Sequence, residues 1–286
     1  MDVRTSGWIN GFLGVLIFSG SLPATRVAVA DFDPVFLTAA RASIAGLMAL
    51  AVLLALRAKR PDRSDLGSLA IIAAGVVLGF PLLTAFALQH ITSAHSIVFI
   101  GLLPLATAVF AVVRGGERPR PSFWLFAGFG AALVAGFALT RGAEASPVGD
   151  SLMIAAVIVC GLGYAEGGKL SRRLGGWQVI CWALVIALPV MLLIGWVAHP
   201  ATLIGVGAPA WLGLAYISLF SMLIGFIFWY RGLAEGGVAA VGQLQLLQPF
   251  FGLALAASLL HEPVGWSMAA VTLAVVVCVA GAKRFA

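Results

Sequence analysis

The chain has 286 residues, of which 62% are hydrophobic and only 10% are charged. A soluble domain carries roughly 25% charged residues, so this composition excludes a water-soluble globular protein and indicates a polytopic membrane protein. The net charge of +6 would suggest a nucleic-acid partner in a soluble chain, but in a membrane protein the basic residues mark topology. We therefore expect no nucleic-acid partner.

Ten apolar segments are long enough to cross a bilayer, which needs about 20 helical residues per span. In chain order they are residues 8–30, 35–56, 66–88, 94–113, 123–140, 151–170, 177–198, 210–230, 239–260 and 266–282. The first segment is as long as a full span and continues directly into Pro23 and Arg26, so we interpret it as a retained helix and not as a cleaved signal peptide. The expected fold class is an all-α integral membrane protein with ten transmembrane helices.

The basic residues predict the orientation of these helices. With an even number of spans both termini lie on the same side, and placing them in the cytoplasm also places most lysines and arginines there. Only Arg26, Arg41 and Arg141 fall elsewhere. We expect a multi-pass protein of the cell (inner) membrane with both termini cytoplasmic.

The two halves of the chain share a pattern. Pro104 interrupts the fourth segment and Pro249 the ninth, 145 residues later, and the same offset aligns Glu117 with Glu262. Because each half holds an odd number of helices, the second copy enters the membrane from the opposite side. We therefore predict two inverted five-helix repeats around a central cavity, 1–145 and 146–286, which is an architecture of secondary transporters that alternate access.

Three motifs resemble those of a known family. The first is Phe32-Asp33-Pro34, followed by Leu37 and Arg41. The second runs from Leu103-Pro104 to Glu117, and the third runs from Gln248-Pro249 to His261-Glu262-Pro263 and is followed by Gly265. With them the chain resembles the drug/metabolite transporter superfamily and, within it, the ten-helix EamA-type carriers. The resemblance covers nearly the whole chain and implies inverted repeats around a central cavity that move small metabolites, often outward. One departure is Ile186 at the second-half position equivalent to Arg41, so the role of this arginine is confined to one half.

Polar side chains in the ninth segment are candidates for the cavity wall. An amide that faces lipid would be unsatisfied, so Gln243, Gln245 and Gln248 face protein or a cavity. On a helix Gln245 and Gln248 lie about 60° apart, whereas Gln243 points well away from Gln248. We predict that Gln245 and Gln248 line the substrate cavity, with hydrogen bonds between helices as the open alternative.

Aromatic side chains and prolines complete the predicted cavity. Phe226, Trp229, Phe80 and Tyr164 are candidates for a stacking surface, and the alternative is lipid-facing bulk with Trp229 in the interfacial belt. The helix breaks at Pro81, Pro104 and Pro249 are interpreted as structural kinks that act as hinges or shape the cavity, with a direct contact to the ligand as the alternative.

Charged residues inside the apolar segments usually mark a pair or a pathway. Arg41 is expected either to bind a substrate carboxylate or to pair with Asp31 or Asp33. Glu166 is expected either to pair with Lys169 three residues later or to take part in proton coupling. Glu117 and Glu262 each come just before a helix and are interpreted as caps.

No catalytic arrangement accompanies these residues. The sequence holds neither His-x-x-Glu-His nor Gly-x-Ser-x-Gly, and its three cysteines and four histidines lack metal-ligand spacing, so we expect no metal, no cofactor and no enzymatic activity. The expected function is a secondary transporter, an exporter of small metabolites such as amino acids or related compounds. An intramembrane enzyme and a membrane scaffold without transport activity are the alternatives. The expected partners are a small-molecule substrate and the lipid bilayer, with a homodimer left open.

Overall fold

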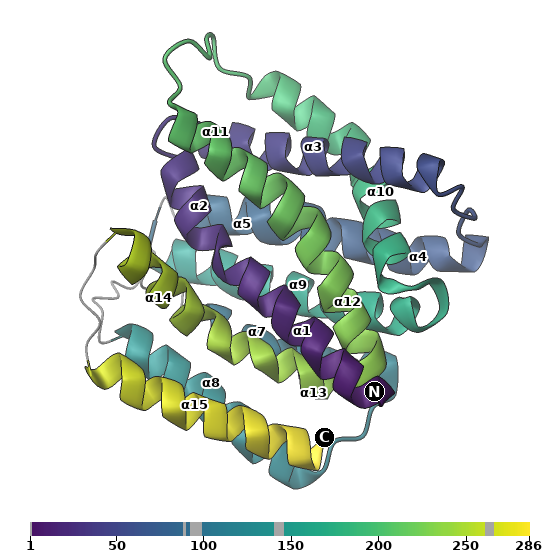
Figure 1. The fold of residues 1–286 in the computed structure, drawn as a ribbon, viewed down its shortest axis with the longest axis vertical. Coiled ribbons are helices and arrows are strands. Elements are labelled where there is room, and N and C mark those ends of the chain that lie inside the picture. The colour runs from purple at the N-terminus through teal and green to yellow at the C-terminus, as the bar shows by residue number, and fades with distance from the viewer. Residues whose placement is uncertain (1, 88–89, 92–98, 140–145, 261–265) are drawn as a thin grey trace.

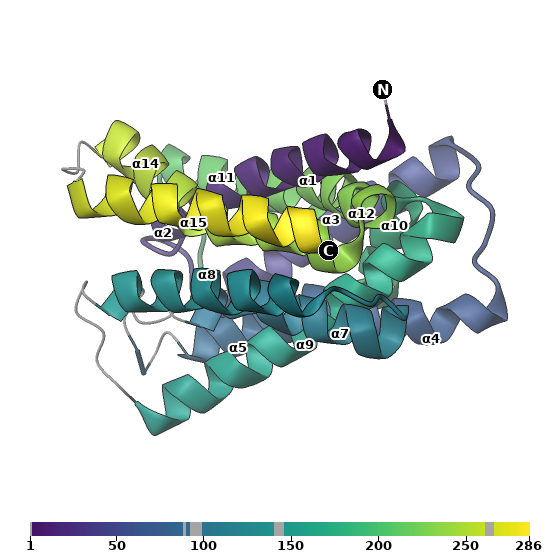
Figure 2. The same ribbon diagram turned by 90° about the horizontal axis from the view of Figure 1, so that it is seen from below.

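The computed structural model describes residues 2–87, 90–91, 99–139, 146–260 and 266–286. The chain is 85% helical and has no strand in these ranges. Its helices run roughly along one direction, and both termini lie at the same end of the bundle (Figures 1 and 2). We call this end the terminal end.

In chain order the helical elements are α1 (Val3–Ser19), α2 (Ser21–Ala28), α3 (Pro34–Ala55), α4 (Arg63–Ile72), η1 (Ala73–Gly79), α5 (Phe80–Ala87), α7 (Leu103–Gly115), α8 (Pro121–Leu139), α9 (Pro147–Leu174), α10 (Gly176–Val197), α11 (Ala208–Ala215), η2 (Tyr216–Ile224), α12 (Gly225–Gly236), α13 (Val238–Gly242), η3 (Gln243–Leu247), α14 (Gln248–Leu260) and α15 (Trp266–Phe285).

Long apolar helices confirm the predicted class of an all-helical membrane protein. Within the described residues six helical stretches are long and apolar enough to span a membrane, and they are Val3–Thr25, Pro34–Ala55, Arg63–Ala87, Pro147–Leu174, Gly176–Val197 and Ala208–Gly236. Leu103–Gly115 and Pro121–Phe137 are shorter apolar helices. Helix also occupies part of every predicted segment, but the count of ten spans stays a prediction.

Three of the apolar segments contain irregular helix. The π-helices η1 and η2 interrupt the third and eighth segments, and the 3₁₀-helix η3 separates α13 from α14 in the ninth. Pro81, Pro104 and Pro249 are each the second residue of the helix that follows an irregular stretch or turn. Since Pro81 follows η1, Pro104 follows the turn at Gly101, and Pro249 follows η3, each proline lies where the regular helical hydrogen bonding has just changed.

Glycines allow α1 and α12 to approach until their backbones touch. Gly7 and Gly11 are four residues apart on α1, and Gly232 and Gly236 have the same spacing on α12, so each helix carries a Gly-x-x-x-Gly face. A Cβ added to Gly232 would lie 2.5 Å from the backbone nitrogen of Gly11 and 2.7 Å from its Cα. Small residues in this pattern are typical of closely packed membrane helices.

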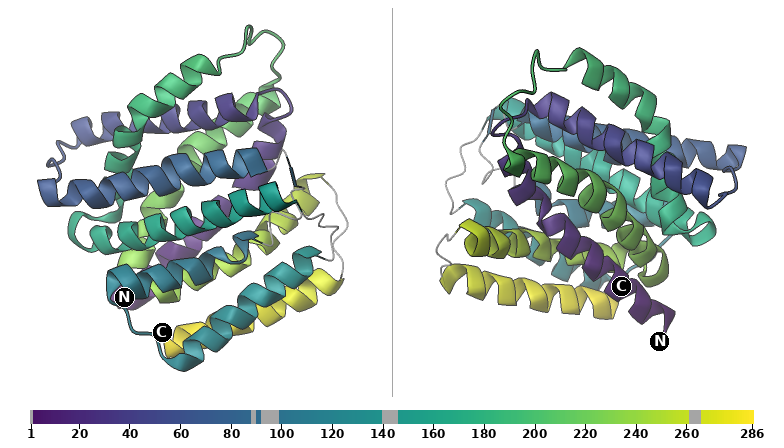
Figure 3. Two further views of the ribbon diagram at one scale, coloured as in Figure 1. Left: turned by 180° about the vertical axis from the view of Figure 1, so that it is seen from behind. Right: turned by 45° about the horizontal axis from the view of Figure 1, so that its top comes forward.

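Helices of the first half (1–145) pack mainly against helices of the second half (146–286). The helix α1 lies along α12, while α9 lies along α4, η1 and α5. Two further pairs, α3 with α10 and α8 with α15, each join one helix from either half, and α8 beside α15 is visible in Figure 3. Consequently the interior of the bundle is a contact between the two halves.

Candidate functional site

A polar cluster lies in the interior where helices from both halves meet. Tyr164 on α9 and Gln245 in η3 are 5% and 3% exposed. The Tyr164 hydroxyl lies within interaction range of the Gln245 side chain and of the Cys160 thiol one turn earlier. The guanidinium of Arg41, from α3, lies close enough to interact electrostatically with Tyr164. We call Arg41, Tyr164 and Gln245 the central polar cluster.

Two atoms of this cluster have no hydrogen-bond partner among the residues that the structure describes. The Nε of Arg41 and the Oε1 of Gln245 are both buried and unpaired. Leaving a buried polar atom unpaired costs about 1–3 kcal/mol, and more when the group is charged. Such atoms therefore need an explanation, and a ligand that hydrogen-bonds to them provides one.

The structure does not pair Arg41 with the acidic residues near its helix. Asp33 instead caps α3, accepting hydrogen bonds from the backbone nitrogens of Val35 and Phe36 at 2.9 and 3.0 Å. Asp31 accepts one from the backbone nitrogen of Gly207 at 2.8 Å. The expectation of an Arg41 pair with either aspartate is thus wrong, because the nearby backbone N–H groups already occupy both carboxylates.

Aromatic rings surround one side of the central polar cluster. The ring of Tyr164 lies 5.6 Å from that of Trp229 and 6.0 Å from that of Phe226, and Phe18 lies 4.8 Å from Phe226 between ring centroids. Trp229 is fully buried, so its interpretation as an interfacial or lipid-facing residue is wrong. Phe80 is partly buried and packs against the same core.

The three glutamines of the ninth segment have different surroundings. Gln243 is fully buried, and its Nε2 donates to the carbonyl of Pro104 at 3.4 Å and to that of Ala239 at 3.5 Å. This residue therefore joins α7 to the ninth segment. Gln245 belongs to the central polar cluster, whereas Gln248 is partly exposed at the first position of α14. Cavity lining by Gln245 and Gln248 stays a prediction.

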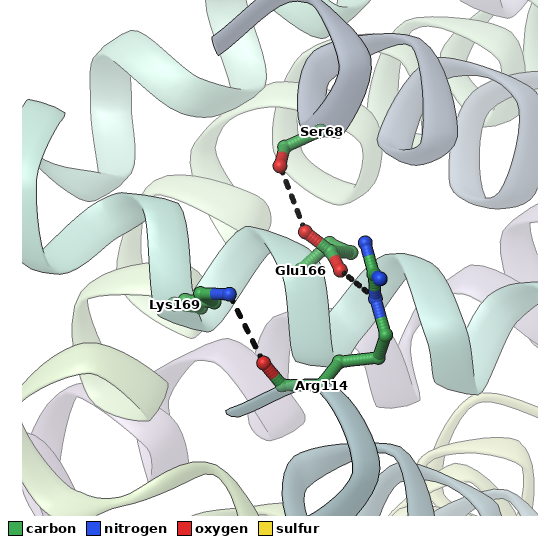
Figure 4. A network of polar contacts seen from close by, with 4 residues as sticks. All are labelled: Ser68, Arg114, Glu166 and Lys169. Carbon is green, nitrogen blue, oxygen red and sulfur yellow. Dashed lines mark hydrogen bonds and ion pairs between the residues drawn. The ribbon is translucent and has the colours of Figure 1, made fainter. Parts of the chain in front are cut away.

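A charged network at the terminal end holds α4, α7 and α9 together (Figure 4). Glu166 is 1% exposed, and its carboxylate accepts hydrogen bonds from the Nε of Arg114 at 2.6 Å and from the hydroxyl of Ser68 at 2.8 Å. Lys169 donates instead to the backbone carbonyl of Arg114 at 3.0 Å. The expected Glu166–Lys169 pair is wrong because Glu166 points inward, where α4 and α7 supply its partners.

Glu117 also contacts the opposite half of the chain. Its carboxylate accepts hydrogen bonds from the backbone nitrogens of Val238 and Ala239 at 2.9 and 2.8 Å, and it pairs with Arg172 at 2.7 Å. Glu117 thus caps α13 and not the helix that follows it in sequence, α8. Glu262, interpreted in the same way, lies outside the described residues.

Ion pairs between the halves gather at the terminal end. Arg114 with Glu166, Arg172 with Glu117, and Arg173 with Asp62 and Asp65 each join one half to the other. We call these pairs the terminal-end network. At the opposite end the described contacts between halves include hydrogen bonds, such as Ser21 to Ser221 at 2.7 Å and Tyr216 to the carbonyl of Ile17 at 2.8 Å. Ion pairs therefore close the terminal end.

The cysteines and acidic residues form no metal centre in the part of the chain that the structure describes. No group of three histidine, cysteine, aspartate or glutamate side chains there could hold an ion. The three cysteines are buried and free.

The central polar cluster can bind a small molecule, because unpaired polar atoms and aromatic rings meet there between the two halves of a membrane protein. In a helical membrane protein, polar groups buried between two related halves are typical of transport proteins.

Comparison with known proteins identifies the family. The model of the EamA-like transporter family matches residues 5–139 and again residues 147–282. The chain belongs to the EamA-like transporter family, which confirms the resemblance to the drug/metabolite transporter superfamily. It is thus an EamA-type transporter.

Individual relatives agree with this assignment. A Bacillus subtilis (strain 168) protein described as "Uncharacterized transporter YdeK" is 67% identical over 286 residues, the full length of both chains. A Streptantibioticus cattleyicolor protein described as "Probable terminal-alkyne amino-acid exporter" is 24% identical over 245 residues, which are 83% of this chain and 80% of that one. A solved crystal structure shares the fold with a TM-score of 0.84 at 21% identity, over 99% of this chain and 100% of the other.

Proposed function

We propose that this chain is a secondary transporter that exports small metabolites of the amino-acid type across the cell membrane by alternating access. The observation that carries the proposal is the central polar cluster, where the buried Nε of Arg41 and Oε1 of Gln245 lack partners beside the aromatic rings. The exporter from Streptantibioticus cattleyicolor supports the direction of transport and the amino-acid class.

The proposed machinery is ten transmembrane helices in two inverted five-helix repeats, 1–145 and 146–286. One family model matches each half separately. The contacts between elements also repeat. The first helix of the first half, α1, lies along α12, and the first helix of the second half, α9, lies along η1 and its flanking helices. The two π-helices also correspond, because Gly79 at the end of η1 and Ile224 at the end of η2 are 145 residues apart. These three observations support an inverted repeat.

The proposed substrate is held by complementary groups in the centre. Arg41 binds the carboxylate, because a buried guanidinium without a counter-ion gains most from an anion that accepts its N–H groups. Gln245 and Gln248 hydrogen-bond to other polar groups of the substrate, and the rings of Tyr164, Phe226 and Trp229 contact its apolar part. Phe80 extends this apolar wall.

In the proposed mechanism the terminal-end network acts as a closed gate. With both termini in the cytoplasm, as the basic loops predict, these ion pairs close the cytoplasmic side in this conformation. Inward opening then requires Glu166 and Glu117 to lose their partners in the opposite half. We assign Glu166 to this gate, and its involvement in proton coupling is a secondary hypothesis.

Transport by the purified protein in liposomes tests the function. We expect saturable uptake of at least one amino acid or related carboxylate from a panel that pairs each acid with its amide. Arg41→Gln should reduce the initial rate at least tenfold, because the carboxylate loses a charged partner worth about 1.5–3 kcal/mol. Arg120→Gln, which removes an exposed arginine, should leave the rate unchanged. No saturable flux for any compound contradicts transport, and equal flux of acids and amides contradicts the role of Arg41.

A further inference from the structure

A cavity of about 400 Å³ lies at the terminal end, between the loop that follows α3 and the turn that joins α9 to α10. Four basic residues line it, namely Arg57, Lys59, Arg60 and Arg173, and its lining contains no acidic residue. Arg173 pairs with Asp62 and Asp65. The three loop cations have no ion pair within the described chain, so the cavity carries uncompensated positive charge. We call it the basic cavity.

A second cavity at the same end shows that this charge is not a general property of the cytoplasmic loops. It measures about 510 Å³, and its lining includes Arg4, Arg118 and Arg172 together with Asp2, Glu117 and Glu235. The basic and acidic side chains there balance each other. The topology rule explains an excess of basic residues at this end of the bundle. It does not explain why one cavity collects cations without acids.

The backbone at Arg57 gives an independent indication. Arg57 has a φ of 48°, and it is the one non-glycine residue with positive φ in the described part of the chain. It ends α3, where the nitrogen of Ala58 donates to the carbonyl of Leu53 at 2.9 Å. Glycine is the usual residue at such a helix end, because a side chain raises the energy of the left-handed conformation. The backbone at this position therefore favours glycine, and a selective role for the arginine side chain would offset that preference.

The remaining wall of the basic cavity is apolar and aromatic. Leu56, Leu174 and Trp177 line it beside the cations. Trp177 is the second residue of α10, so it lies where an apolar helix begins, at the level where tryptophan is enriched in membrane proteins. Cations next to an apolar wall at this depth match a phospholipid, whose phosphate adjoins its glycerol and acyl chains.

We propose that the basic cavity binds the phosphate of an anionic phospholipid headgroup, such as phosphatidylglycerol, from the cytoplasmic leaflet. The planar guanidinium of Arg57 presents paired N–H donors that suit phosphate oxygens, while Lys59 and Arg60 add positive charge. Trp177 contacts the glycerol region. This site lies apart from the central polar cluster and holds a lipid, not the transported substrate.

Thermal unfolding of the purified protein in detergent tests the site. Phosphatidylglycerol should raise the unfolding midpoint, whereas phosphatidylcholine with the same acyl chains should not, because a ligand that binds the folded state stabilises it. The triple variant Arg57→Gln/Lys59→Gln/Arg60→Gln should need on the order of a hundredfold more phosphatidylglycerol for the same shift. This factor follows because each basic residue near an anionic headgroup contributes roughly fivefold.

A matched variant separates the site from general electrostatic attraction. Arg4→Gln/Arg118→Gln/Arg120→Gln removes three exposed arginines from the same end and should keep the wild-type response. The proposal is overturned if the two triple variants respond alike, or if phosphatidylglycerol does not stabilise the wild type. Equal stabilisation by inorganic phosphate or glycerol 1-phosphate overturns the assignment to lipid and points to a soluble phosphate ligand.

Arg57→Gly makes the test independent of folding defects. Glycine suits the positive φ of this position, so the variant should unfold at the same temperature as the wild type or higher when no lipid is added. Its response to phosphatidylglycerol should nevertheless fall about fivefold. A full response in this variant contradicts a role for Arg57 in lipid binding.

Discussion

Gln243 and Gln245 are two residues apart in η3, both are buried, and the Oε1 of each is unpaired within the described residues, but the two side chains differ in what else they contact. Gln243→Leu removes the hydrogen bond to the carbonyl of Pro104 and should lower the free energy of unfolding by about 1 kcal/mol. Gln245→Leu removes an unpaired Oε1 together with the contact to Tyr164, two effects of opposite sign, so stability should stay within about 1 kcal/mol of the wild type. Thermal unfolding of the two variants in detergent measures the difference.

Ligand response completes this comparison. An amino acid that stabilises the wild type should still stabilise Gln243→Leu but not Gln245→Leu, since only Gln245 belongs to the central polar cluster. If both variants lose stability equally and keep the ligand response, both glutamines serve as contacts between helices and the cavity assignment is wrong.

Glu166 is a second residue whose surroundings make a quantitative prediction. Glu166→Gln keeps the shape of the side chain but removes the charge that holds Arg114. Because Glu166 is buried and Arg114 is 47% exposed, we expect a loss of about 1–2 kcal/mol in the free energy of unfolding, below the cost of a fully buried pair. The coupling between Glu166→Gln and Arg114→Gln in a double-mutant cycle measures it.

The matched control is Glu235→Gln. Glu235 pairs with Arg231 four residues earlier on α12, where Arg231 is 59% exposed, and it also interacts with the side chain of Ser6 on α1. A pair of this kind contributes about 0.3–0.5 kcal/mol, so the variant should unfold close to the wild type. A larger effect at Glu235 than at Glu166 would contradict the greater contribution expected from the buried Glu166 pair.

At the scale of elements, the glycine faces of α1 and α12 predict which helices must touch. A Cβ at Gly232 would meet backbone atoms of Gly11, which cannot move aside without separating the helices. Gly232→Ala should therefore lower the free energy of unfolding by about 1–3 kcal/mol. Gly128→Ala on α8 is the control, because no heavy atom lies within 4 Å of its Cβ and alanine favours helix by about 0.5–1 kcal/mol. Equal unfolding temperatures for both variants would contradict close packing of α1 and α12.

The sequence predicted the helices better than it predicted which helices contact each other. Long apolar segments and prolines are local signals, and helix is found in every predicted segment. The Gly-x-x-x-Gly pairs at Gly7 and Gly232 are also visible in the sequence, but nothing local shows that these two helices face each other. The cap formed by Glu117 was assigned to the following helix for the same reason. Its true partner, Val238, is 121 residues away.

The same holds for the candidate site residues: the sequence was enough to select them, but not to identify their partners. Polarity and helical spacing were enough to select Gln245, and intramembrane charge was enough to select Arg41 and Glu166. Their partners depend on how the halves pack, so the sequence did not identify Arg114 as the partner of Glu166. The only local signal for Arg114 is that it is a basic residue at the end of an apolar segment. The roles of the unpaired Arg41 and Gln245 atoms could not be read from the sequence, because the absence of a partner is a property of the folded interior.

At the scale of the whole molecule, the position of the ion pairs predicts which side opens when they break. The terminal-end network joins the halves by ion pairs that Glu117 and Glu166 form with arginines of the opposite half. Removing charges from the network should favour a conformation open at the terminal end. The protein offers its own reporter, since Cys160 is 1% exposed and lies beside Tyr164 in the centre.

Labelling of Cys160 by a small thiol reagent tests this in a background with Cys181→Ser and Cys278→Ser, where no other cysteine reacts. In membrane vesicles, Glu117→Gln/Glu166→Gln should raise the labelling rate from the terminal side about tenfold, which corresponds to a shift of about 1.4 kcal/mol in the equilibrium between closed and open conformations. Glu235→Gln, which removes a charge at the same end outside the terminal-end network, should not change the rate. An unchanged rate in the double variant, or an increase only from the opposite side, would mean that the network stabilises the fold without gating access to its centre.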